Sequence, residues 1–442
     1  MDTLDVFMFG KLAGQVRRLA SGQMAFRYDS DWLHDARAIP ISPQFPLQAE
    51  EFAGEAVSAY FDNLLPEGSA RDFIARALHV SADNAFGILS RFGADTAGAL
   101  VFLPPDKDPR NTARYLPVSP ADIQNWIAYT HGVALNIPDD EDDDNTEQTA
   151  SLSGAQDKMS IFIAPDGSIA LPIGSAPSSH ILKPNMPEHK AIPETAVNEV
   201  LIMQLAHAVG IHVPQVNFVP ELNAALVQRY DRMRSPDGTL LRLHQNDLCQ
   251  ILGYARGQKY EVEGGPTFKQ CLLAVKTHST QPDKDVRRMF EWLFFNLAVG
   301  NMDSHAKNVS LITTPGGETR LAPFYDLLCT TVYPYLSKRF AFKIGGENRP
   351  GWMRQRHLQQ FADDLGVDAD FLRAIAHGVC DNITASMPGI CAALHEQVKH
   401  KEGVAIMGKI EEEVRRSVGR VRAHMVAAPE QKPQPSFPRM GM

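Results

Sequence analysis

The chain has 442 residues, with 43 Lys and Arg against 52 Asp and Glu, so its formal net charge is -9 at pH 7. This length exceeds what one hydrophobic core usually supports, so we expect two or three domains with a cleft between them. The acidic balance disfavours a broad electrostatic grip on nucleic acid or anionic lipid. The five cysteines are odd in number and widely spaced, which argues against a disulfide framework and a zinc module.

The start of the chain does not read as an export signal. It is Met-Asp-Thr-Leu-Asp, without the basic start and small-residue cleavage site of a signal peptide. The longest apolar stretch, residues 289–302, contains Glu291 and Asn296 and is shorter than the ~20 residues that cross a bilayer. We therefore expect a cytoplasmic protein without membrane contact.

The first part of the chain predicts a compact α+β unit followed by a linker. Residues 1–104 alternate short strand-like and helical pieces and end at a Pro-Pro pair. Residues 105–148 contain one predicted helix, 120–130, and then the acidic run 139–144, whose like charges repel and favour an extended linker. At the other end of the chain, residues 428–442 are rich in Pro and polar residues and are predicted to be disordered.

The rest of the chain predicts a small sheet lobe over 149–230 and a helical lobe over 231–427. Within the small lobe one helix is predicted over 195–209. Strands are predicted over 159–164, 169–172, 179–183 and 225–229. The helical lobe is interrupted by one predicted hairpin, 309–313 and 320–324, joined by a Pro-Gly-Gly turn. The fold class is therefore predicted to be α+β with two lobes.

A polar loop leaves the apolar helix that ends at Gly300 and leads into this hairpin. Phosphoryl transfer needs a carboxylate near the attacking hydroxyl and oxygen ligands for Mg²⁺. Asp303, Asn308 and, after the hairpin, Asp326 follow the order of the kinase template. Asp303 would orient or deprotonate the acceptor hydroxyl, and Asn308 and Asp326 would hold Mg²⁺. An isolated D-x-x-x-x-N is more often a polar turn, but the hairpin and second Asp favour the kinase.

Cations are also expected near the transferred phosphate. Lys307 and His305 lie inside the polar loop and would offset phosphoryl charge, although His305 is equally read as a structural histidine. Lys183 ends a predicted strand, where a kinase places its phosphate-binding lysine. Its ion-pair partner is expected to be Glu199, with Glu194 as the alternative.

Two further segments fit a nucleotide site. The small-residue turn Ser153-Gly154-Ala155-Gln156-Asp157-Lys158 precedes a strand and could form a phosphate nest of backbone amides. The segment Gln228-Arg229-Tyr230 ends a strand where the helical lobe begins, as a hinge against adenine would. Ordinary edge packing of Tyr230 explains the second segment equally well.

Five ordered motifs together resemble the HipA family of bacterial serine/threonine kinases, the toxin half of a toxin–antitoxin pair. They are Asn63-Leu64-Leu65-Pro66-Glu67, Ser151 to Lys158, His244-Gln245-Asn246-Asp247, Lys259-Tyr260-Glu261 to Gly264-Gly265-Pro266, and the D-x-H-A-K-N stretch from Asp303 to Asn308. The resemblance covers roughly residues 3 to 425. It implies a bilobal protein-kinase-like fold with an added N-terminal subdomain.

The resemblance also implies cofactors and a site. ATP and Mg²⁺ would be used, with Asp303 catalytic and Asn308 and Asp326 at the metal. Autophosphorylation would fall on Ser151 and silence the enzyme, with Ser153 as a nearby competitor. The residues implied to hold ATP are Ser153, Gly154, Ala155, Gln156, Asp157, Lys158, Lys183, Gln228, Arg229, Tyr230, His305, Ala306, Lys307, Asn308, Tyr325 and Asp326.

The partners implied by the resemblance are proteins. They are a HipB-like helix-turn-helix antitoxin and a protein substrate of the aminoacyl-tRNA synthetase class, such as glutamyl-tRNA synthetase. Operator DNA is expected only through the antitoxin, because the segment Phe361-Ala362-Asp363-Asp364-Leu365 is acidic where a family member carries basic residues. Two alternatives stay open: a small-molecule kinase, and a catalytically inactive antitoxin-binding co-repressor.

Overall fold

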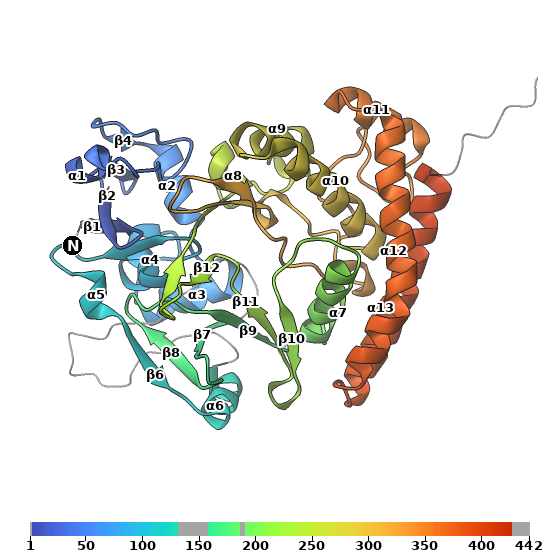
Figure 1. Ribbon diagram of the computed structural model, residues 1–442, viewed down its shortest axis with the longest axis horizontal. Coiled ribbons are helices and arrows are strands. Elements are labelled where there is room, and N and C mark those ends of the chain that lie inside the picture. The colour runs from blue at the N-terminus through green and yellow to red at the C-terminus, as the bar shows by residue number, and fades with distance from the viewer. Residues whose placement is uncertain (1, 131–157, 186–190, 427–442) are drawn as a thin grey trace, which may run out of the picture.

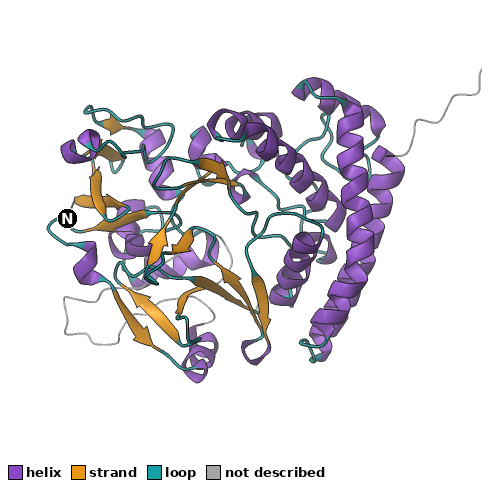
Figure 2. Cartoon of the chain, viewed as in Figure 1, coloured by secondary structure: helices purple, strands orange, loops and turns teal. Residues whose placement is uncertain are grey.

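The computed structural model describes residues 2–130, 158–185 and 191–426. Strands gather in the first part of the chain and the long helices in the second. Figure 2 shows the strands mostly on one side of the molecule and the long helices on the other. In Figure 1 the blue and green sheets lie on one side of the molecule, and two long orange helices form the opposite edge. Within the described ranges, no helix is both long enough and apolar enough to span a membrane.

The N-terminal subdomain is built on a five-stranded antiparallel sheet in the order β4-β3-β2-β1-β5. Its strands are β1 (Thr3–Met8), β2 (Lys11–Arg18), β3 (Met24–Tyr28), β4 (Phe52–Ala53) and β5 (Leu100–Leu103). Leu4, Val6 and Met8 alternate along β1 and are fully buried, because one face of the sheet packs on a core. Four helices complete that core: α1 (Ser30–His34), α2 (Glu55–Asp62), α3 (Gly68–Ala77) and α4 (Ala85–Phe92).

A second, six-stranded sheet has the order β10-β11-β9-β7-β8-β6. Its strands are β6 (Arg114–Pro117), β7 (Met159–Ile163), β8 (Ile169–Ile173), β9 (His180–Pro184), β10 (Val216–Val219) and β11 (Ala224–Gln228). The four strands predicted in this region are therefore present, each shifted by no more than about one residue at either end. Helix α7 (Thr195–Ala208) packs between this sheet and the helical lobe. It is buried on most sides, so apolar residues surround it rather than forming one stripe, and its polar Asn198 and Glu199 are buried as well.

Several short strands differ from the sequence prediction. Residues 114–117 were expected in a linker, yet they form β6 and pair with β8. The stretch after residue 231 was expected to be helical up to the hairpin, yet it contains three strands. They are β12 (Arg232–Arg234), β13 (Leu240–Arg242) and β14 (His244–Asp247). Each is only three or four residues long, too short for an apolar alternation to mark it, and β14 is wholly polar. β14 is held by pairing with β15 (Ser310–Thr313) of the predicted hairpin, which also includes β16 (Thr319–Leu321).

The helical lobe packs around α10, in which every residue from 292 to 299 is buried. Its helices are α8 (Leu248–Leu252), α9 (Phe268–His278), α10 (Pro282–Val299), α11 (Gln355–Leu365), α12 (Ala369–His395) and α13 (Lys401–Val421). Two helices flank the second sheet, α5 (Pro109–Thr112) and α6 (Pro120–Thr130), and the latter has the bounds predicted for it. Short helical turns complete the chain: η1 (Gly93–Asp95), η2 (Pro220–Leu222), η3 (Glu261–Glu263), η4 (Ala306–Asn308), η5 (Thr330–Val332) and η6 (Arg422–Val426).

Candidate active site

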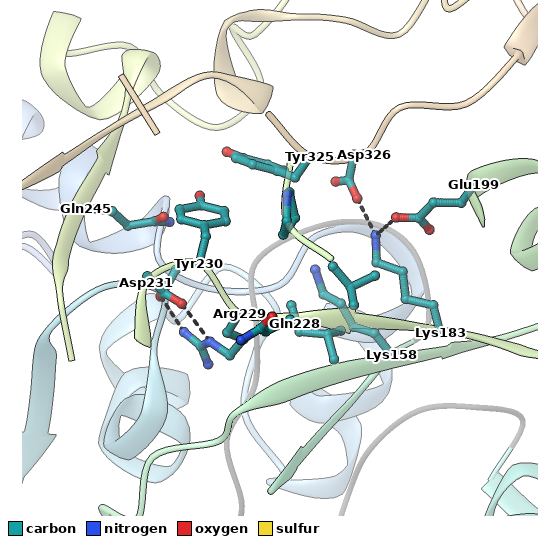
Figure 3. A pocket seen from close by; sticks show the side chains of 14 residues that line it. Lys158, Lys183, Glu199, Gln228, Arg229, Tyr230, Asp231, Gln245, Tyr325 and Asp326 are labelled. Atoms are coloured by element: carbon teal, nitrogen blue, oxygen red, sulfur yellow. Dashed lines mark hydrogen bonds and ion pairs between the residues drawn. The ribbon is translucent and has the colours of Figure 1, made fainter. Parts of the chain in front are cut away.

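A cleft with about 620 Å³ of open space lies between the second sheet and the segment that follows β16. Figure 3 shows it from close by, with side chains from β9, β11, α7 and the segment after β16 converging on it. Seven of the residues predicted to hold ATP line this cleft: Lys158, Lys183, Gln228, Arg229, Tyr230, Tyr325 and Asp326. Segments far apart in the sequence therefore meet in one concave site.

Lys183 is the electrostatic centre of the cleft. Its ammonium donates to Glu199 Oε1 at 2.6 Å and also to Asp326 Oδ1, as the dashed lines in Figure 3 show. Burial alone would lower the pKa of Lys183, but the carboxylates of Asp326 and Glu199 outweigh burial and raise it, so this lysine stays charged. The predicted pair with Glu199 is thus present. The alternative partner Glu194 instead accepts from Asn185 at 2.7 Å and contacts His400 at 2.9 Å.

Lys158, which is half-buried, supplies a second amino group to the same cleft. Burial lowers its pKa to about 8, although the nearby Asp326 carboxylate acts in the opposite direction. Lys158 is therefore a cation at neutral pH that loses its proton in mildly alkaline solution. Two lysines with different pKa values thus face the same space.

Asp326 is held in a backbone conformation that non-glycine residues rarely adopt, with φ of 53°. Its neighbours fix it there. The Tyr325 hydroxyl donates to the Lys307 backbone carbonyl at 2.8 Å, and Phe324 stacks on the buried Trp292 with ring centroids 5.4 Å apart. Such strain is kept only where the surroundings enforce it, and it is common at functional sites.

The predicted hinge segment lines the cleft, and part of its backbone is already hydrogen-bonded. The backbone N–H groups of Gln228 and Arg229 already donate within the sheet, to Gln215 and Ser179 carbonyls, both at 2.9 Å. The Tyr230 ring stacks on Tyr325, with centroids 5.6 Å apart, and closes one end of the cleft.

The Arg229 guanidinium turns into a buried charge network that joins the hinge to the N-terminal subdomain. It donates to Asp231 Oδ2 at 2.6 Å and contacts Asp95 Oδ2 at 3.3 Å. Arg232 and Arg242 also pair with Asp95. Arg229 therefore lines the cleft, but its guanidinium is paired with buried carboxylates inside the protein.

The predicted catalytic loop begins where α10 ends at Gly300, whose φ is 76°. A Cβ at this position would lie 2.1 Å from Thr331 Oγ1, so only glycine fits the turn. The next residues lead to Asp303, which is exposed to solvent and accepts a hydrogen bond from the Tyr260 hydroxyl. Asn308 Nδ2 donates to the Asp303 backbone carbonyl at 3.1 Å and closes the loop. The side-chain oxygen Oδ1 of Asn308 is then left as its potential metal ligand.

Two cations predicted to offset phosphoryl charge have other surroundings. Burial lowers the pKa of His305 to about 4, so its imidazole is neutral at neutral pH. The Lys307 ammonium donates to the Asn63 carbonyl and to Asn63 Oδ1, each at 2.8 Å. Both residues are buried, and neither lines the cleft. Their predicted role near the transferred phosphate stays a prediction.

Some predicted residues lie outside the described residues. They are Ser151 and the turn from Ser153 to Asp157. Other contributors were missed by sequence reasoning, notably Tyr260 at Asp303, and Gln245 and Asp231 in the cleft lining. The motifs around Tyr260 and Gln245 had been singled out without a role, and only the fold shows what they contact.

The donor set near the cleft fits one kind of metal ion. No cluster of three or more His, Cys, Asp or Glu side chains suited to a metal occurs within the described ranges. Mg²⁺ is usually bound by one or two protein oxygens, with waters and substrate phosphates as the other ligands. The Asp326 carboxylate at the cleft is one such oxygen. The Asn308 amide oxygen stays the predicted second ligand, although Asn308 is not among the residues that line the cleft. Glu199 Oε2, which has no hydrogen-bond partner within the described part of the chain, adds a further buried oxygen at the cleft.

Comparison with known proteins accounts for both halves of the molecule. A family model described as the HipA N-terminal domain matches residues 4–103, and one described as the HipA-like C-terminal domain matches residues 150–387. The putative kinase Y4mE of Sinorhizobium fredii is 37% identical over 84% of this chain and 87% of that protein.

The likeness extends to a solved structure. The serine/threonine-protein kinase toxin HipA of Shewanella oneidensis is 29% identical over 84% of this chain and 85% of that protein. The HipA chain in a Shewanella oneidensis complex of HipA, HipB and operator DNA matches with a TM-score of 0.78 and 25% identity, covering 96% of this chain and 98% of that one. The predicted α+β kinase-like fold is confirmed, and the chain belongs to the HipA family.

Proposed function

We propose that the protein is a Mg·ATP-dependent serine/threonine protein kinase and the toxin of a type II toxin–antitoxin module. The observation that carries the proposal is Lys183, whose ammonium joins Glu199 of α7 and Asp326 inside one cleft (Figure 3). A lysine paired to a helix glutamate, beside an aspartate able to bind metal, is the arrangement that phosphoryl transfer from ATP requires. The naming of two relatives as kinases supports the same activity.

The cleft has the chemistry of a nucleotide site. Ile181, Val227 and Tyr230 provide an apolar wall, and Lys158 and Lys183 provide positive charge next to it. A purine ring needs an apolar wall, and a polyphosphate needs positive charge. When bound, Mg·ATP would supply the transferable phosphoryl group and neutralise part of its charge. Lys183 and Lys158 would hold the phosphates, and Asp326 and Asn308 would hold the metal.

Asp303 would act on the acceptor. Asp303 is exposed to solvent, so a serine or threonine hydroxyl of another protein can reach its carboxylate. It would orient that hydroxyl and take up its proton while the hydroxyl oxygen bonds to phosphorus and the bond to the ADP oxygen breaks. The neutral His305 beside it, in edge contact with Tyr260 at 5.0 Å, would keep the loop in shape rather than add charge.

The biological setting is proposed from the relatives. Because the solved HipA structure contains HipB and operator DNA, we propose a HipB-like helix-turn-helix antitoxin as partner, with DNA reached through it. The substrate would be a protein, with the aminoacyl-tRNA synthetase class as the leading candidate. Phosphorylation at Ser151 would switch the enzyme off.

Incubation of the full-length protein with Mg²⁺ and γ-labelled ATP tests this proposal. Label should appear on the protein itself, at Ser151 or Ser153, and peptide mapping should locate it. Asp303→Asn should reduce labelling by about 10²- to 10⁴-fold, the usual contribution of a positioned acid or base. Asp364→Asn, which changes an exposed aspartate of α11, is the matched control and should label normally.

Other outcomes would favour another activity. Turnover of a sugar or antibiotic hydroxyl without self-labelling would identify a small-molecule kinase. Growth arrest that persists unchanged in Asp303→Asn would contradict the kinase mechanism and favour a non-catalytic co-repressor. Relief of arrest by a co-expressed helix-turn-helix neighbour would support the antitoxin assignment.

A further inference from the structure

The N-terminal subdomain reaches the predicted catalytic loop through one short segment. Residues 63–67, which link α2 to α3, are buried although they are a connection rather than an element. Buried connections need internal partners for their polar groups. Most of these partners lie within the subdomain, such as the Phe61 carbonyl for the Leu64 N–H, but Asn63 and Glu67 also bond to residues of the helical lobe. The segment therefore joins two lobes.

Asn63 is the main contact. Its backbone carbonyl and its Oδ1 both accept from the Lys307 ammonium, at 2.8 Å each. Its Nδ2 donates to the Ala59 carbonyl of α2 and to the Tyr254 carbonyl of the helical lobe, at 2.9 Å each. Asn63 is only 1% exposed. One asparagine thus uses its whole amide to join α2, the loop after α8 and the catalytic loop.

Carboxylates complete the setting of Lys307. Glu67 Oε1 and Asp247 Oδ2 each lie 3.5 Å from its ammonium nitrogen. Glu67 also pairs with Lys259 at 2.8 Å, and Lys259 precedes Tyr260, which donates to Asp303. An ammonium has three hydrogens. With two on Asn63 and the third facing these carboxylates, Lys307 has no donor left for a phosphate.

The backbone of the same lysine leads to the metal-binding side of the site. The Lys307 carbonyl accepts from the Tyr325 hydroxyl at 2.8 Å, and Tyr325 precedes Asp326. The two flanks of the loop, Asp303 and Asn308, are in turn joined by their own hydrogen bond. Fixing Lys307 therefore fixes the relative positions of the groups proposed for catalysis.

We propose that Asn63 and Glu67 of the N-terminal subdomain are positioning residues, which hold the catalytic loop in its working geometry by anchoring Lys307 and Lys259. This inference rests on the proposed kinase function for its effect on rate, but the anchoring itself does not. Lys307 acts as a structural tether in this view. The N-terminal subdomain becomes part of the catalytic unit rather than an appended module.

The test compares variants of the full-length protein by two measurements. One is kcat and KM for ATP in self-labelling or substrate labelling. The other is amide hydrogen exchange of peptides spanning residues 301–309, with the β1 peptide, residues 3–8, as an internal check that the subdomain stays folded. Asn63→Ala should lower kcat by about 10- to 100-fold, with KM for ATP within about twofold, and should speed exchange in 301–309 only. Asn63→Asp keeps an acceptor for Lys307 but loses the donor to the Ala59 and Tyr254 carbonyls, so it should recover only part of kcat.

A matched control lies in the same subdomain. Asn84 caps α4 through its contact with the Gly87 N–H at 3.0 Å and does not touch the loop, so Asn84→Ala should leave kcat and loop exchange unchanged. Equal effects of Asn84→Ala and Asn63→Ala would overturn the proposal, since loss of subdomain stability would then explain both. Wild-type kcat and exchange in Asn63→Ala would overturn it as well.

The test also covers an unfolded Asn63→Ala subdomain and a wild-type protein without kinase activity. If Asn63→Ala loses β1 protection, Glu67→Ala replaces it, because alanine removes the carboxylate that pairs with Lys259 and faces Lys307. The same rise in 301–309 exchange is expected there, and its absence would contradict the anchoring. If the wild-type protein transfers no phosphate, the proposed function fails, while the exchange data still decide whether Asn63 and Glu67 anchor the loop.

Discussion

Lys183 and Glu199 form a buried ion pair whose nitrogen and oxygen are 2.6 Å apart, and the two side chains are 5% and 1% exposed. They come from β9 and from α7, which packs against the sheet. A charge buried this deeply is tolerated only when its partners neutralise it. The pair therefore locks the position of α7 to the position of the lysine that faces the cleft.

Glu199→Gln should damage both stability and activity. Removal of one partner of a buried pair typically costs about 3–5 kcal/mol when the remaining charge is left unpaired, but Lys183 keeps Asp326, so we expect a cost below that range. We expect a lower urea midpoint and at least about a tenfold loss of nucleotide affinity, measured by titration with a fluorescent ATP analogue. Glu194→Gln changes a glutamate at the start of the same helix that pairs with His400 instead, so it should bind nucleotide normally. Equal affinity of both variants for the ATP analogue would show that Glu199 does not contribute to nucleotide binding.

Nucleotide binding should weaken above about pH 8 through Lys158. Burial lowers the pKa of this lysine to about 8 in the free protein, so its charge is present below that pH and is lost as the pH rises through it. The pKa of Lys183 is raised, so that lysine does not titrate in the same range. Affinity should therefore fall by up to about tenfold per pH unit above pH 8. Lys158→Arg keeps its charge and should flatten the profile between pH 7 and 9.5; parallel profiles would contradict this role.

Much of this arrangement could be predicted from the sequence because it depends on local patterns. The alternation of apolar residues located the strands around Lys183, and the Gly300 turn and the hairpin that follows it located the loop that we propose to be catalytic. Polar strands such as β14 carry no such pattern, since pairing with β15 rather than their own composition holds them. The partners of Lys307 and Arg229 were beyond prediction for another reason. Asn63 lies 244 residues before Lys307 in the chain, and no single sequence states which buried charges meet.

Asp95 should be a centre of stability at the junction of the N-terminal subdomain and the hinge. It is fully buried and faces Arg229, Arg232 and Arg242. Although burial acts to raise the pKa of Asp95, the three guanidinium groups outweigh it and hold that pKa well below its usual range. Asp95→Asn leaves these arginines short of a negative charge and should cost about 3–5 kcal/mol, seen as a lower urea midpoint.

The pH dependence of the Asp95 effect has a definite sign. A depressed pKa contributes stability that is present above the unfolded value of about 3.9 and is lost as the pH falls below it. The gap in stability between wild type and Asp95→Asn should therefore be constant near neutral pH and narrow below about pH 4. Asp370→Asn is the control: that aspartate is 86% exposed in its pair with Arg373, so it should cost less than about 1 kcal/mol. A constant gap down to pH 3 would contradict the assignment.

Tyr260→Phe should slow catalysis without weakening ATP binding. The Tyr260 hydroxyl donates to the Asp303 carboxylate and so fixes the oxygen that would receive the acceptor proton. Phenylalanine keeps the edge contact with the His305 ring, 5.0 Å between centroids, and removes only the hydroxyl. A hydrogen bond to a charged group contributes about 1.5–3 kcal/mol, so kcat should fall by roughly 10- to 100-fold.

The split between kcat and KM decides how Tyr260 acts. Tyr260 is absent from the lining of the cleft, so KM for ATP should stay within about twofold of wild type. Tyr335→Phe removes a hydroxyl from a tyrosine that is 82% exposed and should leave both constants unchanged. A higher kcat in Tyr260→Phe would mean that the hydroxyl competes with the acceptor for Asp303 and restrains the enzyme. An unchanged kcat would show that Asp303 needs no fixed orientation, because the acceptor hydroxyl alone would then align it.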